Sequence, residues 1–338
     1  MWLALYALIG TSSAAEHRVF RAEMTIESLA EDLGDPTLAD VIRKLNDLDP
    51  GEQAEVGSIV MLPSLHADHV DQDAAVLSWS GDVEIQTPGS ARVPAAVGAS
   101  LPPGSVVCTL SDGFATIRLA ISLKGRFHDD LSLLPDTCLT VTSTFARSGA
   151  RGSLVSVDSG SISVRAAEDE PGAITVVTPS GVTSGDAGGF RVTIEDNAAR
   201  TEAVGAPTTV FGAGAEVAVD TGYGSRVRTG EAPSDAVKLL EPGAPASPDN
   251  GASLRRADFT WTPVERALGY RIELSAAPDF SDVIRIEDVP AAEWRPERLF
   301  LPYRIRGLWW RIASFDRTGF QGAFSEARTL ALPGGVGP

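Results

Sequence analysis

Apolar and polar residues alternate along a long central part of this chain. The runs with an apolar residue at every second position are residues 154–157, 173–176, 190–194 and 216–219. That period is typical of a strand that buries one face. Between these runs, residues 158–160, 178–181, 195–197 and 220–222 carry the Asp, Asn, Ser, Thr, Pro and Gly that tight turns require. The pattern predicts short antiparallel strands, arranged either as a two-sheet sandwich or as a β-solenoid.

The pattern before residue 64 is different. A short strand is expected at 17–20, and a closing strand at 56–63. Thr25 can cap a first helix, which Gly34 ends. Thr37 is expected to start a second helix, with Asp40 as its capping-box partner. The apolar positions of the two helices are spaced as one buried face requires, and they are Ile26, Leu29, Ala30, Leu33 and then Leu38, Val41, Ile42, Leu45. The order is strand, helix, helix, strand.

The residues of this segment resemble a LysM domain, a small βααβ module. The similarity lies in Thr25-Ile26, Leu29-Ala30, 45–48 and the run Val-Gly-x-Ile-x-x-Leu-Pro at 56–63. The resemblance implies binding of peptidoglycan or another N-acetylglucosamine polymer in a shallow groove between two loops. The residues that it assigns to this groove are Glu23, Met24, Thr25, Ile26, Asn46, Asp47 and Leu48.

One departure from the family pattern concerns the first loop. Where LysM domains have Gly-Asp-Thr, this chain has Glu23-Met24-Thr25. Losing the glycine stiffens the loop and adds a side chain where the backbone would approach a sugar. The alternative is a module of the same fold that serves as a spacer or docks a protein, since fold does not fix function.

Residues 77–230 resemble a FecR domain, a bacterial periplasmic domain. The similarity rests on the order of several short motifs, among them Asp-Gly-x-Ala-x-Ile-x-Leu at 112–119, Leu-Pro-Asp-Thr at 134–137 and Val-Thr-Pro at 177–179. In FecR regulators a cytoplasmic segment and one membrane helix precede this domain. Neither is expected here, so anti-sigma signalling of that kind is not predicted.

Beyond a Pro/Gly/Ala/Asp-rich linker at 231–252, residues 253–333 again alternate, now with many aromatic residues. This part resembles a fibronectin type III-like sandwich, in which Trp261 and Tyr270 would belong to the core. Core packing is the favoured explanation for the aromatic cluster, and a sugar-stacking platform is the alternative.

The first fifteen residues have the pattern of an export signal, without its positive start. An apolar run from Trp2 to Ile9 is followed by small residues up to Ala15, where a signal peptidase would cut. A short anchor or a plain N-terminal helix is the alternative. Export predicts a periplasmic or secreted protein with no membrane span in the mature chain. In that compartment Cys108 and Cys138 can form one disulfide, although two small buried apolar side chains would also fit.

Charge and motifs exclude several classes of function. The formal net charge is −17 and the chain has only three lysines, so nucleic acid and anionic membrane surfaces are not expected partners. No phosphate-binding loop, dinucleotide fingerprint or nucleophile elbow occurs, and no cofactor is predicted. The run containing His66, Asp68, His69, Asp71 and Asp73 is interpreted as a solvated linker at 64–76 and not as a metal site.

A remote alternative is an aspartic-type protease. Asp158-Ser-Gly and Asp220-Thr-Gly have the form of that family's catalytic triplet, in which two carboxylates share a proton. The same residues suit hairpin turns, and both triplets occur where a turn is expected.

The sequence therefore predicts a mainly β chain in three parts. A small βααβ N-terminal module (16–63) precedes a central FecR-like all-β domain (77–230) and a C-terminal β-sandwich (253–333). The predicted function is non-catalytic, and it consists of binding peptidoglycan and scaffolding or sensing in the bacterial cell envelope. The alternative is an envelope sensor or assembly factor that binds protein instead of glycan.

Overall fold

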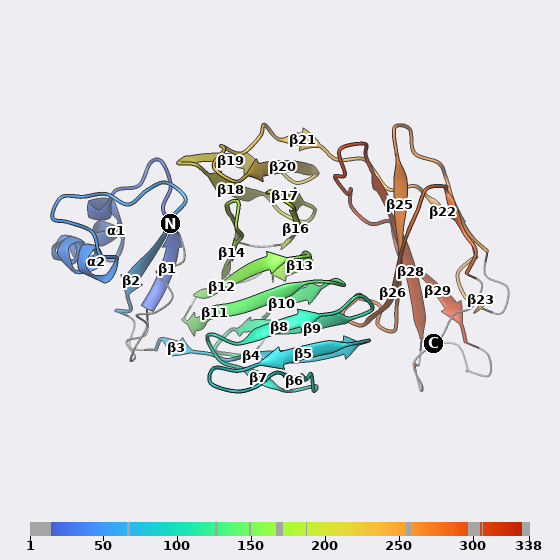
Figure 1. Cartoon of the computed structure of the whole chain (residues 1–338), viewed down its shortest axis with the longest axis horizontal. Helices are drawn as coiled ribbons and strands as arrows, with labels where there is room; N and C mark the ends of the chain where they lie inside the picture. Colours follow the sequence, from blue (N-terminus) through green and yellow to red (C-terminus); the bar gives the residue numbers. More distant parts are fainter. Residues whose placement is uncertain are drawn as a thin grey trace.

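A computed structural model describes residues 15–65, 68–125, 128–148, 150–166, 172–186, 188–254, 258–296, 305 and 307–332. Residues 1–14 of the expected export segment lie outside these ranges. The described chain forms three parts in a row, with a small helical module on one side, a stack of strands in the middle and a second β domain on the other side (Figure 1). Within these ranges, no helix has the length and hydrophobicity needed to cross a membrane.

The N-terminal module has the expected strand–helix–helix–strand order. Its elements are β1 (Ala15–Val19), α1 (Ile26–Asp32), the 3₁₀-helix η1 (Pro36–Leu38), α2 (Ala39–Leu45) and β2 (Ile59–Pro63). The two strands pair antiparallel. Thr25 caps α1 as predicted, and its hydroxyl accepts a hydrogen bond from the amide of Ser28. The predicted face of α1 is buried, with Ile26 fully enclosed.

The prediction for the second helix is wrong in two respects. The helix begins at Ala39 and has no side-chain cap, because Asp35 instead caps η1 by accepting from the amide of Thr37 at 2.9 Å. Val41 and Leu45 are 43% and 41% exposed, although they were expected on the buried face. A 3₁₀ turn has 3.0 residues per turn, so η1 shifts the phase of the helix that follows. Ile42 keeps its predicted place in the core.

The central domain is a sandwich of two large sheets. The nine-stranded sheet has the order β21 (Val237–Lys238), β20 (Tyr223–Arg228), β17 (Ala198–Ala203), β16 (Gly188–Glu195), β13 (Ser161–Ala166), β10 (His128–Leu133), β9 (Phe114–Ile121), β4 (Ala74–Ser80), β7 (Ser100–Leu101). The ten-stranded sheet has the order β19 (Ala215–Val219), β18 (Thr208–Gly212), β15 (Val182–Gly185), β14 (Gly172–Val177), β12 (Ala150–Ser159), β11 (Cys138–Arg147), β8 (Val106–Thr109), β5 (Val83–Gln86), β6 (Val93–Pro94), with β3 (Val70–Asp71) beside β11.

Both sheets grow in the order of the sequence. After β4 the chain sends one or two strands to one sheet, then one or two to the other, so that successive pairs stack from β6 and β7 at one end to β19 and β21 at the other (Figure 1). All neighbouring strands are antiparallel except β12 and β14, which pair in parallel because β13 lies between them in sequence but belongs to the opposite sheet. The domain is thus a two-sheet sandwich whose strands advance along one axis, as in a solenoid.

Burial in this sandwich exceeds what the alternating pattern predicts. All six residues of β17 are buried, including the polar residues Thr201 and Glu202. The apolar positions point into the core between the sheets, as expected. Parts of the outer faces are buried as well, because the N-terminal module packs on the ten-stranded sheet and the C-terminal domain packs on the nine-stranded sheet (Figure 1). A strand such as β17 is therefore buried on both faces.

The two cysteines lie opposite each other on neighbouring strands. Cys108 of β8 is in register with Cys138 of β11, and a disulfide joins them. The bond lies within the ten-stranded sheet and closes a loop over a sequence separation of 30 residues. The disulfide therefore links β8 covalently to β11.

The C-terminal domain is a smaller sandwich. Its sheets are β22 (Pro245–Ser247), β24 (Phe259–Trp261), β27 (Glu293–Trp294), and β23 (Ala252–Ser253), β29 (Arg328–Ala331), β28 (Leu308–Phe315), β25 (Gly269–Ser275), β26 (Val283–Val289). Trp261 and Tyr270 pack edge to face in its core, as predicted. Because Phe259, Trp261 and Trp310 are all at least 97% buried, these rings pack the core and offer no sugar platform.

One ion pair lies inside the central sandwich. Arg151 of β12 donates from Nε and Nη2 to the two carboxylate oxygens of Asp129 of β10, at 2.9 and 2.8 Å, and so joins the two sheets. Both side chains are 0% exposed. A buried charge without its partner is strongly unfavourable, whereas the intact two-pronged pair is tolerated.

We predict that Arg151→Met lowers the free energy of unfolding by about 3–5 kcal/mol, because Asp129 stays buried without its arginine. Chemical denaturation of the purified protein measures this change. Arg18→Met is the matched control, since the Arg18–Asp32 pair is 41% and 60% exposed and such pairs contribute at most about 1 kcal/mol. The double variant Arg151→Met/Asp129→Leu should recover most of the loss, and equal effects of Arg151→Met and Arg18→Met would contradict the assignment.

Candidate functional site

The two loops assigned to a glycan groove lie next to each other at one end of the N-terminal module. The loop after α2 reaches the start of α1, where the side-chain oxygen of Gln53 accepts a hydrogen bond from the amide of Ile26 at 2.7 Å. Met24 from the first loop and Leu48 from the second pack against the same apolar cluster. The sequence-predicted residues are therefore brought together, although most of them are not free to contact a ligand.

Four of the seven predicted residues serve the module itself. Thr25 is the helix cap, and Ile26 and Leu48 contribute to the core. The side chain of Asn46 makes three hydrogen bonds, donating to the carbonyls of Ile42 at 2.7 Å and Met61 at 2.8 Å and accepting from the amide of Met61 at 2.7 Å. Asn46 thus ties the end of α2 to β2.

Glu23 and Asp47 are the predicted residues that remain available. Both are exposed, and neither carboxylate has a hydrogen-bond or ion-pair partner among the described residues. Glu23 lies in a turn that the hydrogen bond from the amide of Met24 to the carbonyl of Arg21 closes at 3.1 Å. The φ angle of Glu23 is not positive, so the loop does not need the glycine that the family pattern has there.

The two Asp-Ser/Thr-Gly triplets are far apart. Asp158 lies near the end of β12, and Asp220 follows β19, with β14, β15 and β18 between them in the sheet. At about 4.8 Å per strand this separates the two strands by roughly 19 Å. β12 and β19 also run in opposite directions, so the two residues lie at opposite sides of the sheet. Asp158 is the last residue but one of β12, and Asp220 begins the turn after β19; both are exposed, and they do not form a shared-proton pair.

The His/Asp-rich segment contributes to domain docking. His66 is outside the described residues, and no group of three or more metal-ligating side chains occurs among those described. His69 stacks on Phe145 of β11 at 5.1 Å between ring centroids, and its Nε2 lies 3.0 Å from Asp71. The segment expected to be a solvated linker is thus held against the ten-stranded sheet.

Phe145 is the centre of the contact between the N-terminal module and the sandwich. The ring of His17 meets it edge-on at 6.0 Å, while His69 covers it from another side. Glu16 next to His17 pairs with Arg147 at 2.8 Å. His17 is only 4% exposed, and burial lowers its pKa to about 4 because the charged imidazolium would lose its hydration.

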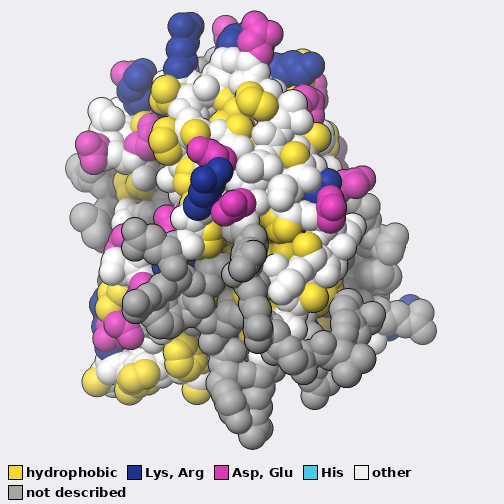
Figure 2. All heavy atoms as spheres, turned by 90° about the vertical axis from the view of Figure 1, so that its right-hand side faces the viewer, with side chains coloured by type: hydrophobic (Ala, Val, Ile, Leu, Met, Phe, Trp, Pro, Cys, Tyr) yellow, Lys and Arg dark blue, Asp and Glu magenta, His cyan; other side chains and the backbone are white. Residues whose placement is uncertain are grey.

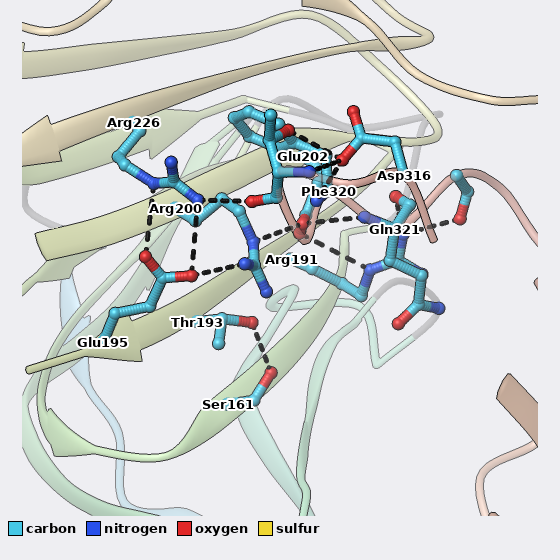
Figure 3. A network of polar contacts seen from close by, with 12 residues as sticks. Ser161, Arg191, Thr193, Glu195, Arg200, Glu202, Arg226, Asp316, Phe320 and Gln321 are labelled. Atoms are coloured by element: carbon cyan, nitrogen blue, oxygen red, sulfur yellow. Dashed lines mark hydrogen bonds and ion pairs between the residues drawn. The ribbon is translucent and has the colours of Figure 1, made fainter. Parts of the chain in front are cut away.

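A network of arginines and glutamates holds the C-terminal domain on the other side of the sandwich (Figure 3). Arg191 of β16 donates to the carbonyls of Gln321 and Gly322 at 2.6 and 2.7 Å. Glu202 of β17 lies between Arg191, at 3.7 Å, and Arg200, at 3.0 Å, and also accepts from the amide of Gln321 at 3.2 Å. Burial lowers the pKa of Arg191 to about 10, which leaves it charged at neutral pH.

The network continues to the rim of the sheet. Arg226 of β20 contacts Glu195 at 3.2 Å and donates to the carbonyl of Thr318 at 2.6 Å. Its guanidinium lies over the ring of Phe320, 5.4 Å from the centroid. These residues were not predicted from the sequence. Charged residues occur at alternate positions of β16, β17 and β20, and this pattern is the feature of the sequence that could have indicated the network.

No protein-family model matches this chain, and no curated protein sequence is similar to it. Among solved structures, two of a candidate anti-sigma factor from Parabacteroides distasonis match at 15% identity, over 39% of this chain and 58% of that chain, with TM-scores of 0.29 and 0.30. The chain thus spans less than two thirds of that protein. The FN1–FN3 domains of chicken CNTN1 match at 12% identity, over 77% of this chain and 96% of that one, with a TM-score of 0.21.

We predict that docking of the N-terminal module weakens as the pH falls from 6.5 toward 4. The folded pKa of His17, about 4, lies below its ordinary value of 6.5, so the unfolded chain takes up the proton first and the folded state loses stability over that interval. The loss in the free energy of unfolding reaches about 3 kcal/mol at the acidic end of this pH interval. Denaturation of the parent and of His17→Leu at pH 7 and pH 4.5 measures it.

The parent should lose more stability between these two pH values than His17→Leu does. His128→Leu, which removes a histidine on β10 of the opposite sheet, is the control for the loss of one histidine as such. Identical pH dependence in the parent and His17→Leu would show that His17 does not control the docking.

Proposed function

We propose that this protein is a non-catalytic cell-envelope protein that binds an N-acetylglucosamine polymer, such as peptidoglycan, through its N-terminal module. The observation that carries the proposal is the adjacency of the two loops, which places the exposed carboxylates of Glu23 and Asp47 at one end of a βααβ module. The rest of the chain is interpreted as a FecR-like and fibronectin-like scaffold.

The chemistry of these groups suits a neutral sugar. Carboxylates without protein partners accept hydrogen bonds from hydroxyl and acetamido N–H groups. Met24, which is half-buried in the first loop, supplies apolar contact for the face of a sugar ring. Because no basic side chain is needed, binding should depend little on salt, and neutral N-acetylglucosamine oligomers should compete.

The mature chain should sediment with insoluble peptidoglycan, and soluble N-acetylglucosamine oligomers should release it. Glu23→Ala/Asp47→Ala is expected to reduce the sedimented fraction at least fivefold, because it removes both free carboxylates without touching the core. Glu31→Ala, an exposed carboxylate on α1 away from both loops, is the matched control and should sediment like the parent.

Sedimentation no greater than that of a denatured sample would reject glycan binding. The alternative, an envelope sensor or assembly factor whose first module docks a protein, would then be favoured. If Glu31→Ala lowers the sedimented fraction as much as the double variant does, the binding is not located in the loops.

A further inference from the structure

A second surface of the molecule is lined mainly by basic side chains, whereas the loops of the N-terminal module carry exposed carboxylates. A cavity of about 730 Å³ opens where the nine-stranded sheet meets the C-terminal domain. Its walls come from the β20 strand, the β21 segment and the turns around residues 266 and 317. This volume is in the range of small-molecule sites. The cavity lies next to β20 and β21 at the end of the nine-stranded sheet, and Arg226, which belongs to the charged network, is part of its wall.

The charged groups that line this cavity are mostly basic. They are Arg226, Arg228, Lys238, Arg266 and Arg317, against Glu231 and Asp316. The chain as a whole has 45 acidic and 28 basic residues, so an excess of cations here runs against its overall balance. Seen from the side of the C-terminal domain, Lys and Arg side chains lie beside Asp and Glu side chains at the upper end of the molecule, where Figure 1 places β21 (Figure 2).

The two acids are already occupied. Oδ1 of Asp316 accepts from the amide and hydroxyl of Thr318, at 2.8 and 2.7 Å, and so holds the turn at that residue. Glu231 lies 3.8 Å from Arg228. Neither acid forms an ion pair with the remaining three cations among the described residues, and five cations against two acids leave the lining with an excess of positive charge.

Three cations of the lining have no partner within the described part of the chain. Lys238, Arg266 and Arg317 are exposed, and none has a hydrogen bond or ion pair there. Like charges that share one cavity repel each other, and an anion would relieve that repulsion. Beneath them lie apolar groups, namely Leu240 and the ring of Phe320, which is 4% exposed.

The backbone at Arg266 supports the same conclusion. Arg266 has a φ of 68°, in the left-handed region that favours glycine, in a turn closed by the amide of Ala267 and the carbonyl of Val264 at 3.2 Å. An arginine in this conformation costs stability that a glycine would not. The strained turn nevertheless places a cation at the cavity.

We propose that this cavity binds a small ligand that carries two or more oxyanion groups, either carboxylates or phosphates. Lys238, Arg266 and Arg317 contact the oxyanions, and Arg226, fixed by Glu195 and Thr318, forms the wall behind them. The guanidinium fork suits planar carboxylate and tetrahedral phosphate alike. The site is independent of the glycan groove in position and in charge.

Calorimetric titration of the full mature chain with citrate and with inorganic tripolyphosphate tests this. One site should appear for at least one of these probes, and its affinity should fall at least tenfold between 50 and 500 mM salt, as binding by exposed cations requires. Uncharged triethyl citrate should not bind. Binding of citrate alone identifies a carboxylate ligand, and binding of tripolyphosphate alone identifies a phosphate ligand.

Two variants locate the site. Lys238→Glu should weaken binding at least tenfold, whereas Lys124→Glu, which makes the same change of charge at an exposed lysine outside the cavity, should change it less than twofold. Arg266→Gly should weaken binding three- to tenfold with an unchanged or raised Tm, so that unfolding cannot explain the loss.

The proposal is overturned if neither anion binds at low salt, or if Lys124→Glu weakens binding as much as Lys238→Glu. Sedimentation with peptidoglycan should be unchanged in the cavity variants. Failure of the anion site and failure of glycan binding are therefore separate results.

Discussion

Burial of charge on the outer faces of the central sandwich is the constraint on which this structure depends. Arginines and glutamates project from β16, β17 and β20 toward the C-terminal domain, where they lose most of their contact with water. A charge in that position is tolerated only if it is paired and hydrogen-bonded. Oε1 of Glu202 satisfies this by accepting hydrogen bonds from Arg200 and the amide of Gln321, while Arg191 pairs with Oε2 at 3.7 Å.

Such a network specifies geometry more than it adds stability. A guanidinium that must donate to two backbone carbonyls, as Arg191 does, accepts only one placement of the loop that carries them. On the opposite sheet the contact is made by rings and apolar side chains around Phe145 and Phe211. The sandwich is thus held from both sides, by a charged network on one face and mainly by rings and apolar side chains, with the Glu16–Arg147 pair, on the other.

This arrangement explains why the two candidate binding surfaces lie at the periphery. The two loops of the N-terminal module and the basic cavity both occur where elements end. Glu23 and Asp47 at one site, and Lys238, Arg266 and Arg317 at the other, are charged groups without protein partners in the described chain. Their opposite signs favour different ligands, a neutral sugar and an anion.

The sequence by itself determined the class of fold, because strand and helix periods and turn residues act locally. The period-two runs at 154–157, 173–176, 190–194 and 216–219 all lie in strands. The predicted turn at 220–222 lies between β19 and β20, whereas residues 158 and 159 of the other predicted turn still belong to β12 and only Gly160 lies between strands. Thr25 caps α1, and Trp261 packs on Tyr270, as their positions predicted.

Only the tertiary structure decided which polar residues are buried. Alternation predicts that every second residue of β17 faces water, and nothing local to Glu202 indicates that another domain covers it. The same holds for the cavity, since Lys238 and Arg317 are 79 residues apart and meet only because β21 joins the nine-stranded sheet beside the C-terminal domain. Contacts between distant segments depend on how whole domains pack, and a local period carries no information about that packing.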